Sequence, residues 1–353
     1  MSALPAASPK GDLTGTAERR EAGMLLQLIA GRWISQAVCV AANLGIADHL
    51  ADESKQVDVL AREVGAAPDA LQRLLRALAS AGVFREVAPR HWALSPCAAL
   101  LRSDVPSSLR GLARFLGTSR HYAAWGALEH SVRNGTQAYR HTHGEEFWQT
   151  LADSPEFAEA FNQSMTSVAQ QFYAAIVSAY DFSAFETLVD VGGGEGELVL
   201  RLLERWPRLL ATVFDLPEAA AAAGRRIAAR GMQHRARAAG GSFFDAIPGG
   251  ADAYMLTHVI HNWNDELAAK ILTNVRGAMR DDSIVLLGEQ VIATGNAPDF
   301  AKLLDLEMLV LTDGGRERTA DDFERLLAAA GLELRRVVNT ASGAKILEAG
   351  LPR

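Results

Sequence analysis

Apolar and polar positions follow two different patterns along this chain. Residues 22–182 consist largely of stretches with apolar side chains at helical spacing, which predicts helices and little sheet. From residue 183 onward, short apolar runs alternate with helical stretches, which is typical of a parallel sheet covered by helices. The predicted strands span 187–191, 211–216, 235–239, 253–259, 284–290, 333–339 and 344–349. A short turn at Ser342-Gly343 joins the last two strands as a hairpin, so the final strand is predicted to be antiparallel to the rest.

The helical N-terminal part divides into three predicted segments. Residues 1–20 are rich in Ala, Pro, Gly, Ser and Thr, and we expect them to be disordered. The stretch 25–50 carries so few charges that its helix must be covered on most faces, by its own domain or by a second subunit. Asp58 is expected to cap the next helix, and a further helix leads into a hairpin at 84–94. Over 21–102 this order forms a winged-helix pattern, which we interpret as an interaction module because it lacks a dense basic face.

Length, charge and cysteine content narrow the possible classes of protein. With 353 residues the chain exceeds one average domain, and we expect a helical substrate-pocket region at 103–182 and a ligand-binding domain at 183–353. The formal net charge of −7 disfavours nucleic acid or an anionic membrane as the main partner. Cys39 and Cys97 are too few for a disulfide framework, and neither a membrane-spanning apolar run nor a signal peptide is evident. A cytoplasmic protein is therefore expected.

The region 103–182 combines many aromatic side chains with several histidines. Aromatic residues at this density form either an ordinary core or the lining of a pocket for a flat organic molecule. His141 and His143 stand two residues apart, as in some metal sites, but apart from the adjacent Glu145 and Glu146 no partner stands at ligand spacing. We interpret them as surface-loop histidines and predict no metal site.

The most informative segment is the apolar run 187–191, because a glycine turn and a helix follow it directly. Glycines let the backbone turn sharply and approach a ligand at the carboxyl end of a strand. Dinucleotide folds seat a pyrophosphate at the helix start with the spacing G-x-G-x-x-G, whereas this turn has G-x-G-x-G beginning at Gly192. Glu195 and Glu197 at the helix start disfavour a phosphate and tolerate a cationic ligand. The alternative is an ordinary turn.

The next two strand ends add groups that suit an adenosine. Asp215 ends the second predicted strand, where an acid can accept hydrogen bonds from both ribose hydroxyls. Its alternative role is to cap the helix that begins near Pro217. Phe243 follows the third strand, where an adenine could lie against its ring.

The segment after the fourth strand contains two histidines that could act as a base, His258 and His261. An imidazole with a pKa of about 6.5 can take a proton from a phenol. His261 falls at the turn into the next helix, closer to an open cleft. Glu289, at the end of the fifth strand, and Glu317 are candidates to anchor its second nitrogen, although each could also be a solvated surface charge.

These segments together resemble the small-molecule O-methyltransferases of the plant caffeate and flavonoid type, and in particular their bacterial relatives that tailor antibiotics such as anthracyclines and mitomycins. The resemblance covers nearly the whole chain, with six motifs in the family order. They are DVGGGEG at 190–196, FDLP at 214–217, GSFF at 241–244, HVIHNWND at 258–265, LLGEQ at 286–290 and GGRERTADDF at 314–323. The resemblance implies a Rossmann-like α/β fold, with a seven-stranded sheet whose last strand is antiparallel, and an N-terminal winged-helix dimerisation domain that forms a homodimer.

The resemblance also implies methyl transfer from S-adenosylmethionine to a phenolic or enolic hydroxyl of an aromatic or quinone molecule, in antibiotic or other secondary-metabolite biosynthesis. His261 would be the general base, oriented by Glu289 and Glu317; the oxygen would attack the sulfonium methyl in line, S-adenosylhomocysteine would leave, and no metal would be required. The implied cofactor contacts are Asp190, Gly192, Gly194, Asp215, Ser242, Phe243 and Thr257. The implied acceptor contacts are Phe161, Met165, Asn262 and Met308.

Two positions depart from the family pattern, and other functions stay open. Asn262 and Ser242 stand where the family usually has Asp, which puts substrate placement and cofactor affinity in doubt. Alternatives within the family are a hydroxylase or decarboxylase that binds the cofactor without methyl transfer, and an N-methyltransferase. The glycine spacing disfavours an NAD-dependent dehydrogenase, and the net charge disfavours a metabolite-sensing winged-helix regulator.

Overall fold

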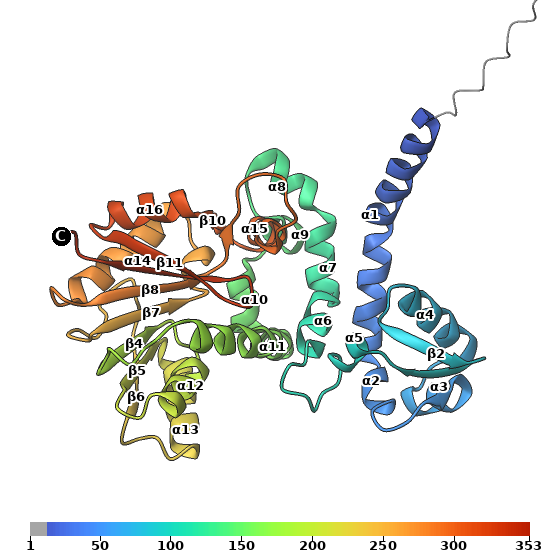
Figure 1. Ribbon diagram of the computed structural model, residues 1–353, viewed down its shortest axis with the longest axis horizontal. Helices are drawn as coiled ribbons and strands as arrows, with labels where there is room; N and C mark the ends of the chain where they lie inside the picture. The colour runs from blue at the N-terminus through green and yellow to red at the C-terminus, as the bar shows by residue number, and fades with distance from the viewer. Residues whose placement is uncertain (1–12) are drawn as a thin grey trace, which may run out of the picture. The chain divides into compact units, whose positions relative to one another are not determined.

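The computed structural model describes residues 13–353, which pack as two compact units divided after Gly117 (Figure 1). Helix α1 begins at Leu13, so residues 13–20 are helical, although disorder was expected up to residue 20. Residues 1–12 lie outside the described part of the chain.

The first unit consists of helices around a small antiparallel sheet of order β1-β3-β2. Its elements are α1 (Leu13–Asn43), α2 (Ile46–His49), β1 (Lys55–Gln56), α3 (Val57–Val64), α4 (Pro68–Ser80), β2 (Phe84–Ala88), β3 (His91–Leu94), α5 (Pro96–Ala99) and α6 (Arg110–Leu116). Helix α6 packs against α1, so this unit extends past the predicted boundary at residue 102. The prediction that Asp58 caps α3 is wrong: Gln56 occupies the N-cap, and Asp58 lies in the first turn, 3.3 Å from Arg90.

Helix α1 is buried only toward its C-terminal end, where Cys39, Ala41 and Ala42 enter the core. Its preceding turns expose large apolar side chains, between 54% and 74%: Met24, Leu25, Leu26, Leu28, Ile29 and Trp33. By length and composition alone, Ala17–Asn43 could cross a membrane, contrary to the expectation that no such run exists. Length and composition do not distinguish a membrane span from a helix that another protein surface covers.

The second unit places a helical region before a mixed sheet. Its helices are α7 (Ser119–Gly126), α8 (Leu128–Asn134), α9 (Ala138–His143), α10 (Phe147–Asp153), α11 (Pro155–Ala179), α12 (Glu197–Arg205), α13 (Pro217–Ala229), the 3₁₀ turn η1 (Ile260–Asn262), α14 (Asp265–Ala278), α15 (Phe300–Leu311) and α16 (Ala320–Ala329). His141 and His143, expected in a surface loop, lie instead in α9. His141 stacks on His130 at 3.8 Å, and Nε2 of His143 lies 2.9 Å from the carbonyl oxygen of Arg120.

The sheet has seven strands in the order β11-β12-β8-β7-β4-β5-β6 (Figure 1). The strands are β4 (Thr187–Val191), β5 (Leu210–Asp215), β6 (Ala236–Gly240), β7 (Ala253–Thr257), β8 (Ile284–Glu289), β11 (Glu333–Asn339) and β12 (Lys345–Gly350), and a separate parallel pair is formed by β9 (Val291–Ile292) and β10 (Arg318–Thr319). Strand β12 is antiparallel to both of its neighbours, which confirms the predicted terminal hairpin. Helices α14 and α16 cover one face of the sheet, and α11, α12 and α13 cover the other.

Candidate active site

The glycine turn after β4 combines left-handed backbone with close packing. Three of its glycines have positive φ, namely 73° at Gly192, 55° at Gly194 and 80° at Gly196. A Cβ at Gly192 would lie 2.6 Å from Cγ2 of Val259, so no side chain fits there. Because Val259 stands two residues before His261, the turn and the predicted base belong to one continuous site.

Two acidic side chains lie beside this turn. Asp190 is buried, a Cβ at Gly193 would lie 2.6 Å from its Oδ2, and that oxygen has no partner among the described residues. Burial raises the pKa of Asp190 to about 7, and the neighbouring Asp215 adds to the rise. Asp215 accepts hydrogen bonds from the backbone N–H of Gly194 at 2.7 Å and of Leu216 at 2.6 Å, and it does not cap α13. A buried carboxylate oxygen without a partner, beside a glycine turn, can accept a hydrogen bond from a hydroxyl or amino group of a ligand.

The two acids at the start of α12, Glu195 and Glu197, both form ion pairs with arginine side chains. Arg226 of α13 contacts both Glu195, at 3.1 Å, and Glu197. Arg201 also lies 2.8 Å from Glu197, one helical turn further along α12. These ion pairs offset much of the negative charge with which the two acids would disfavour a phosphate.

The segment after β6 places an aromatic ring beside the glycine turn. Cε1 of Phe243 lies 3.8 Å from the position that a Cβ would take at Gly192. Its ring also meets Trp263 edge to face, with centroids 6.0 Å apart. Oγ of Ser242 accepts a hydrogen bond from the backbone N–H of Phe244 at 3.1 Å. Ser242 thus stabilises the local turn, a role that an Asp at this position could also serve.

Strand β7 ends earlier than predicted because the backbone turns at His258. Its φ of 54° lies in the left-handed region that non-glycine residues rarely adopt, and the 3₁₀ turn η1 follows at once. The buried Oγ1 of Thr257 and Nε2 of His258 have no partner among the described residues. Burial lowers the pKa of His258 to about 3, with a contribution from His261. His258 is therefore uncharged at neutral pH.

His261 is held between two buried carboxylates. Its Nδ1 lies 2.7 Å from Oε1 of Glu317 and 3.9 Å from Oε2 of Glu289. Oε1 of Glu289 accepts the backbone N–H groups of Val259 at 3.1 Å and of Ile260 at 2.8 Å, which ties this carboxylate to the turn that carries His261. A carboxylate can only accept, so the proton of a neutral imidazole lies on Nδ1 and leaves Nε2 with a lone pair.

The parallel pair β9 and β10 explains why Glu289 and Glu317 meet, although they are 28 positions apart in the sequence. Glu289 stands two positions before β9, and Glu317 directly precedes β10. Arg318 pairs with Val291 in that ladder, which brings the two chain segments side by side. The intervening loop also needs glycine, since a Cβ at Gly315 would lie 2.8 Å from the carbonyl oxygen of His261.

Charges around His261 oppose the effect of its burial. Burial by itself lowers the pKa of the imidazole, but Glu289 and Glu317 raise it and Arg318 lowers it, and the resulting pKa is raised to about 9. The pKa of Glu289 is also raised, first by its burial and then by Glu317, while His261 and two backbone N–H groups lower it. The site thus stabilises a protonated imidazole.

The predicted acceptor residues lie on three elements. Phe161 of α11 meets the ring of Phe147 edge to face at 5.4 Å within a group of aromatic rings. Met165, one turn further along α11, is exposed, whereas Met308 of α15 is buried. Asn262 donates a hydrogen bond to the carbonyl oxygen of His258 at 3.1 Å, so its amide is engaged within its own turn.

Nitrogen and oxygen atoms of His258, His261 and Glu289 lie within 4.8 Å of one another, close enough to be considered as metal ligands. His261 and Glu289 already have the partners described above, Glu317 and two backbone N–H groups. Hydrogen bonds within the chain thus already engage His261 and Glu289, whereas Nε2 of His258 has no partner among the described residues.

The sequence did not predict the polar contacts of several aromatic and histidine residues in this unit. His121 of α7 lies 2.8 Å from Oε1 of Glu307 on α15, and Trp125 donates to the other oxygen of that carboxylate. Burial raises the pKa of Tyr173 on α11, and the charges of Asp190 and other acids add to the rise. No local motif signals these contacts, because their partners are far apart in sequence.

Comparisons with known proteins identify the family of this chain. The family model described as the O-methyltransferase domain matches residues 125–333, and that described as the O-methyltransferase dimerisation domain matches residues 26–104. A phenazine O-methyltransferase of Lysobacter antibioticus is 43% identical over 326 residues, covering 92% of this chain and 95% of that protein. The solved structure of a mitomycin 7-O-methyltransferase has a TM-score of 0.86 at 35% identity, covering 96% of this chain and 100% of that one.

One relative with a similar share of identical residues is named for another activity. The aclacinomycin 10-hydroxylase of Streptomyces purpurascens is 34% identical over 316 residues, covering 88% of this chain and 84% of that protein. Two O-methyltransferase family models match this chain, and relatives match it over most of its length. The chain belongs to the S-adenosylmethionine-dependent O-methyltransferases that carry an N-terminal dimerisation domain.

Proposed function

We propose that this enzyme transfers the methyl group of S-adenosylmethionine to a phenolic or enolic hydroxyl of an aromatic or quinone molecule in secondary-metabolite biosynthesis, with His261 as general base. One observation carries the proposal: Nδ1 of His261 lies 2.7 Å from the buried Glu317, in a turn that also packs against Gly192. A base oriented by a carboxylate and placed beside the cofactor turn is what deprotonation of an acceptor requires.

The cofactor supplies a methyl group that its sulfonium already activates, so the chain has to align the groups and accept a proton. His261 takes the hydroxyl proton at Nε2, and Glu289 and Glu317 stabilise the imidazolium that forms. Nearby carboxylates raise the pKa of this imidazole, which supports the assignment. Alignment of bound groups accounts for a large part of catalysis in such a site.

We assign the cofactor contacts to residues on the edge of the sheet near the glycine turn. Gly192 and Gly194 leave room for the methionine part, Asp190 and Asp215 offer carboxylate oxygens, and Phe243 offers a ring face for the adenine. The unpartnered Oδ2 of Asp190 and Oγ1 of Thr257 are consistent with a bound polar ligand, and Ser242 completes the set. Phe161, Met165, Asn262 and Met308 are proposed to line the acceptor.

Incubation with methyl-labelled S-adenosylmethionine is expected to label hydroxyquinones, hydroxyphenazines or aromatic hydroxy acids. Matched acceptors in which the hydroxyl is already methylated should stay unlabelled, and amino analogues test N-methylation. Transfer should persist in the presence of a chelator, because the proposed chemistry needs only the imidazole and two carboxylates. Hydroxylation or decarboxylation of these compounds without methyl transfer would favour the alternative represented by the hydroxylase.

We also propose that the N-terminal part, residues 21–102, forms a homodimer. The exposed apolar side chains of α1 support this, because such a surface is covered in a stable protein. Sedimentation at micromolar concentration is expected to give a dimer, and Trp33→Glu is expected to shift it toward monomer. Val132→Glu, which changes an exposed apolar residue of α8, is the matched control and should leave the dimer intact. A monomeric wild-type protein would contradict the proposal.

A further inference from the structure

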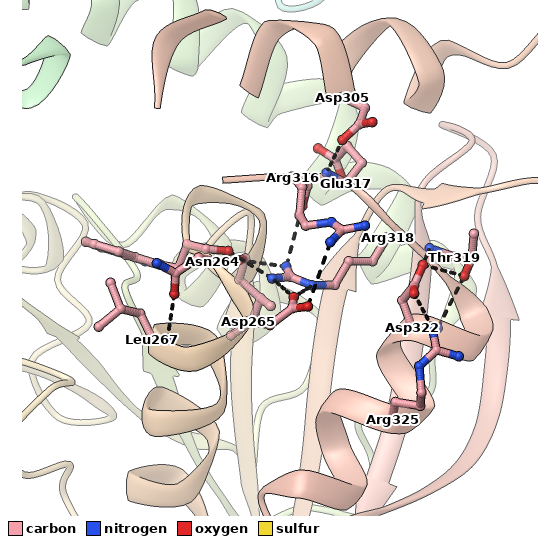
Figure 2. Close-up of polar contacts among 12 residues, drawn as sticks. Asn264, Asp265, Leu267, Asp305, Arg316, Glu317, Arg318, Thr319, Asp322 and Arg325 are labelled. Atoms are coloured by element: carbon pink, nitrogen blue, oxygen red, sulfur yellow. Dashed lines mark hydrogen bonds and ion pairs between the residues drawn. The ribbon is translucent and has the colours of Figure 1, made fainter. Parts of the chain in front are cut away.

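The side chain of Arg318 forms several hydrogen bonds around the turn that carries His261. Its side chain is only 1% exposed, and it directly follows Glu317 in sequence (Figure 2). Nη1 donates to the carbonyl oxygen of Ile260 at 3.1 Å, and Nη2 donates to that of Trp263 at 2.9 Å. These carbonyl groups lie on either side of His261, so one guanidinium holds both ends of its turn.

The same guanidinium also binds the start of α14. Nε and Nη2 of Arg318 donate to Oδ1 of Asp265 at 2.9 Å and 2.7 Å, as Figure 2 shows. Asp265 is 64% exposed, so its charge is largely solvated while the guanidinium is not. Burying a cation is costly unless its donors are satisfied, and here a carboxylate and backbone carbonyls satisfy them. The arrangement joins β10, η1 and α14.

A second connection runs along the backbone beside this cluster. The N–H of Arg316 donates to the carbonyl oxygen of His261 at 2.8 Å. The N–H of Glu317 donates to Oδ1 of Asp305 on α15 at 2.9 Å (Figure 2). The loop that carries Glu317 is thus attached both to the turn of His261 and to α15. A shift of Arg318 would therefore change the distance between His261 and Glu317.

We propose that Arg318 is a positioning residue for the reaction: it holds the carbonyl groups that flank His261 and so keeps the imidazole in hydrogen-bond distance of Glu317. The proposal rests on the proposed function of His261 as base. Arginine suits the task because its planar fork reaches two carbonyls and a carboxylate at once, whereas a lysine ammonium is a single point charge.

Arg318 also acts on His261 through its charge. The charged or titratable groups that face His261 are Glu289 from β8, Glu317 from the loop before β10, Arg318 from β10 and His258 from its own segment. The arginine charge lowers the pKa of the imidazole against the two carboxylates. Removing it should raise the pKa of His261 and move the acid limb of the pH–rate profile to higher pH.

Three variants test the proposal: Arg318→Met, Arg318→Lys and Arg325→Met. Arg318→Met is expected to lower kcat by about 10- to 100-fold with little change in KM, because a small misplacement of a catalytic group is costly. Its acid limb should also move to higher pH. Arg318→Lys keeps the positive charge, so the acid limb of the pH–rate profile should stay at the wild-type pH, whereas turnover should fall. Arg325→Met removes an exposed arginine that pairs with Asp322 and should behave as wild type.

Hydrogen–deuterium exchange of the segment 258–264 provides a readout that does not depend on activity. Faster exchange in Arg318→Met, with wild-type exchange in Arg325→Met, supports the proposal. Unchanged exchange and an unchanged acid limb in Arg318→Met would overturn it, even where His261 proves to be the base. Conversely, if His261 variants retain turnover, the proposed function fails, and the exchange result still decides whether Arg318 holds the turn. If Arg318→Met does not fold, Arg318→Lys and Asp265→Asn carry the same comparison.

Discussion

Replacing His261 with alanine is expected to lower turnover by about 100-fold or more, while the protein still binds S-adenosylmethionine. The proposed mechanism loses its base, and the two carboxylates are not placed to substitute for it, because both are fully buried on the Nδ1 side of His261. The proposed contacts of the glycine turn with the cofactor should remain, since Gly192 packs against Val259 rather than against the imidazole. Single-turnover transfer of a labelled methyl group measures the chemical step, and calorimetry measures cofactor binding.

Removing the imidazole also leaves Glu289 and Glu317 buried without their partner, so folding needs its own control. His261→Asn keeps a polar side chain and should show a similar loss of turnover with wild-type thermal unfolding. His234→Ala changes an exposed histidine and should leave turnover unchanged. Near-normal turnover in both His261 variants would exclude His261 as the base. Loss of turnover in His258→Ala alone would assign the role of base to His258.

Glu317→Gln is expected to lower turnover by about 100-fold or more, as expected when a base loses the carboxylate that sets its tautomer. A carboxylate only accepts, whereas an amide can also donate to Nδ1 and so favour the wrong tautomer. The pH dependence should change in a defined direction as well. Glu317 raises the pKa of His261, so its neutralisation lowers that pKa and moves the acid limb of kcat/KM to lower pH. A pH–rate profile at saturating cofactor measures both effects.

The matched control for this variant is Glu324→Gln, which neutralises an exposed acid on α16. It should leave turnover and the acid limb unchanged. An acid limb that stays at the wild-type pH in Glu317→Gln would show that the 2.7 Å contact does not tune the base. Loss of turnover without any shift would then reflect a structural role of the carboxylate.

Local sequence patterns predicted the strands well because most strands of this sheet are short apolar runs bounded by turn residues. Strands β4 and β11 have the predicted bounds, and the others differ by one or two residues. The positive φ of His258 ended β7 before the predicted residue 259, since a left-handed residue at this position leaves no signal in the pattern of apolar residues. The hairpin before β12 was predictable because Ser342-Gly343 is a local turn signal.

Contacts between distant elements were not predictable in the same way. The pairing of Glu195 and Glu197 with Arg226 depends on α12 and α13 packing side by side, and the sequence reading took both acids as uncompensated. Arg318 stands next to Glu317 in a motif already singled out, yet its bonds to Ile260 and to Asp265 require the folded arrangement of β10, η1 and α14.

The order of helices and strands, the glycine turn and the candidates His261, Glu289 and Glu317 could all be predicted from the sequence, because they depend on residue type and on spacing within one element. The folded arrangement was needed to show that Nδ1 of His261 lies 2.7 Å from Glu317, that Glu289 binds the same turn, and that a buried guanidinium holds the carbonyl groups on either side of His261. Hydrogen bonds and charge effects act over a few ångströms in space. Residues far apart in the chain reach that range only after the sheet and its covering helices have packed.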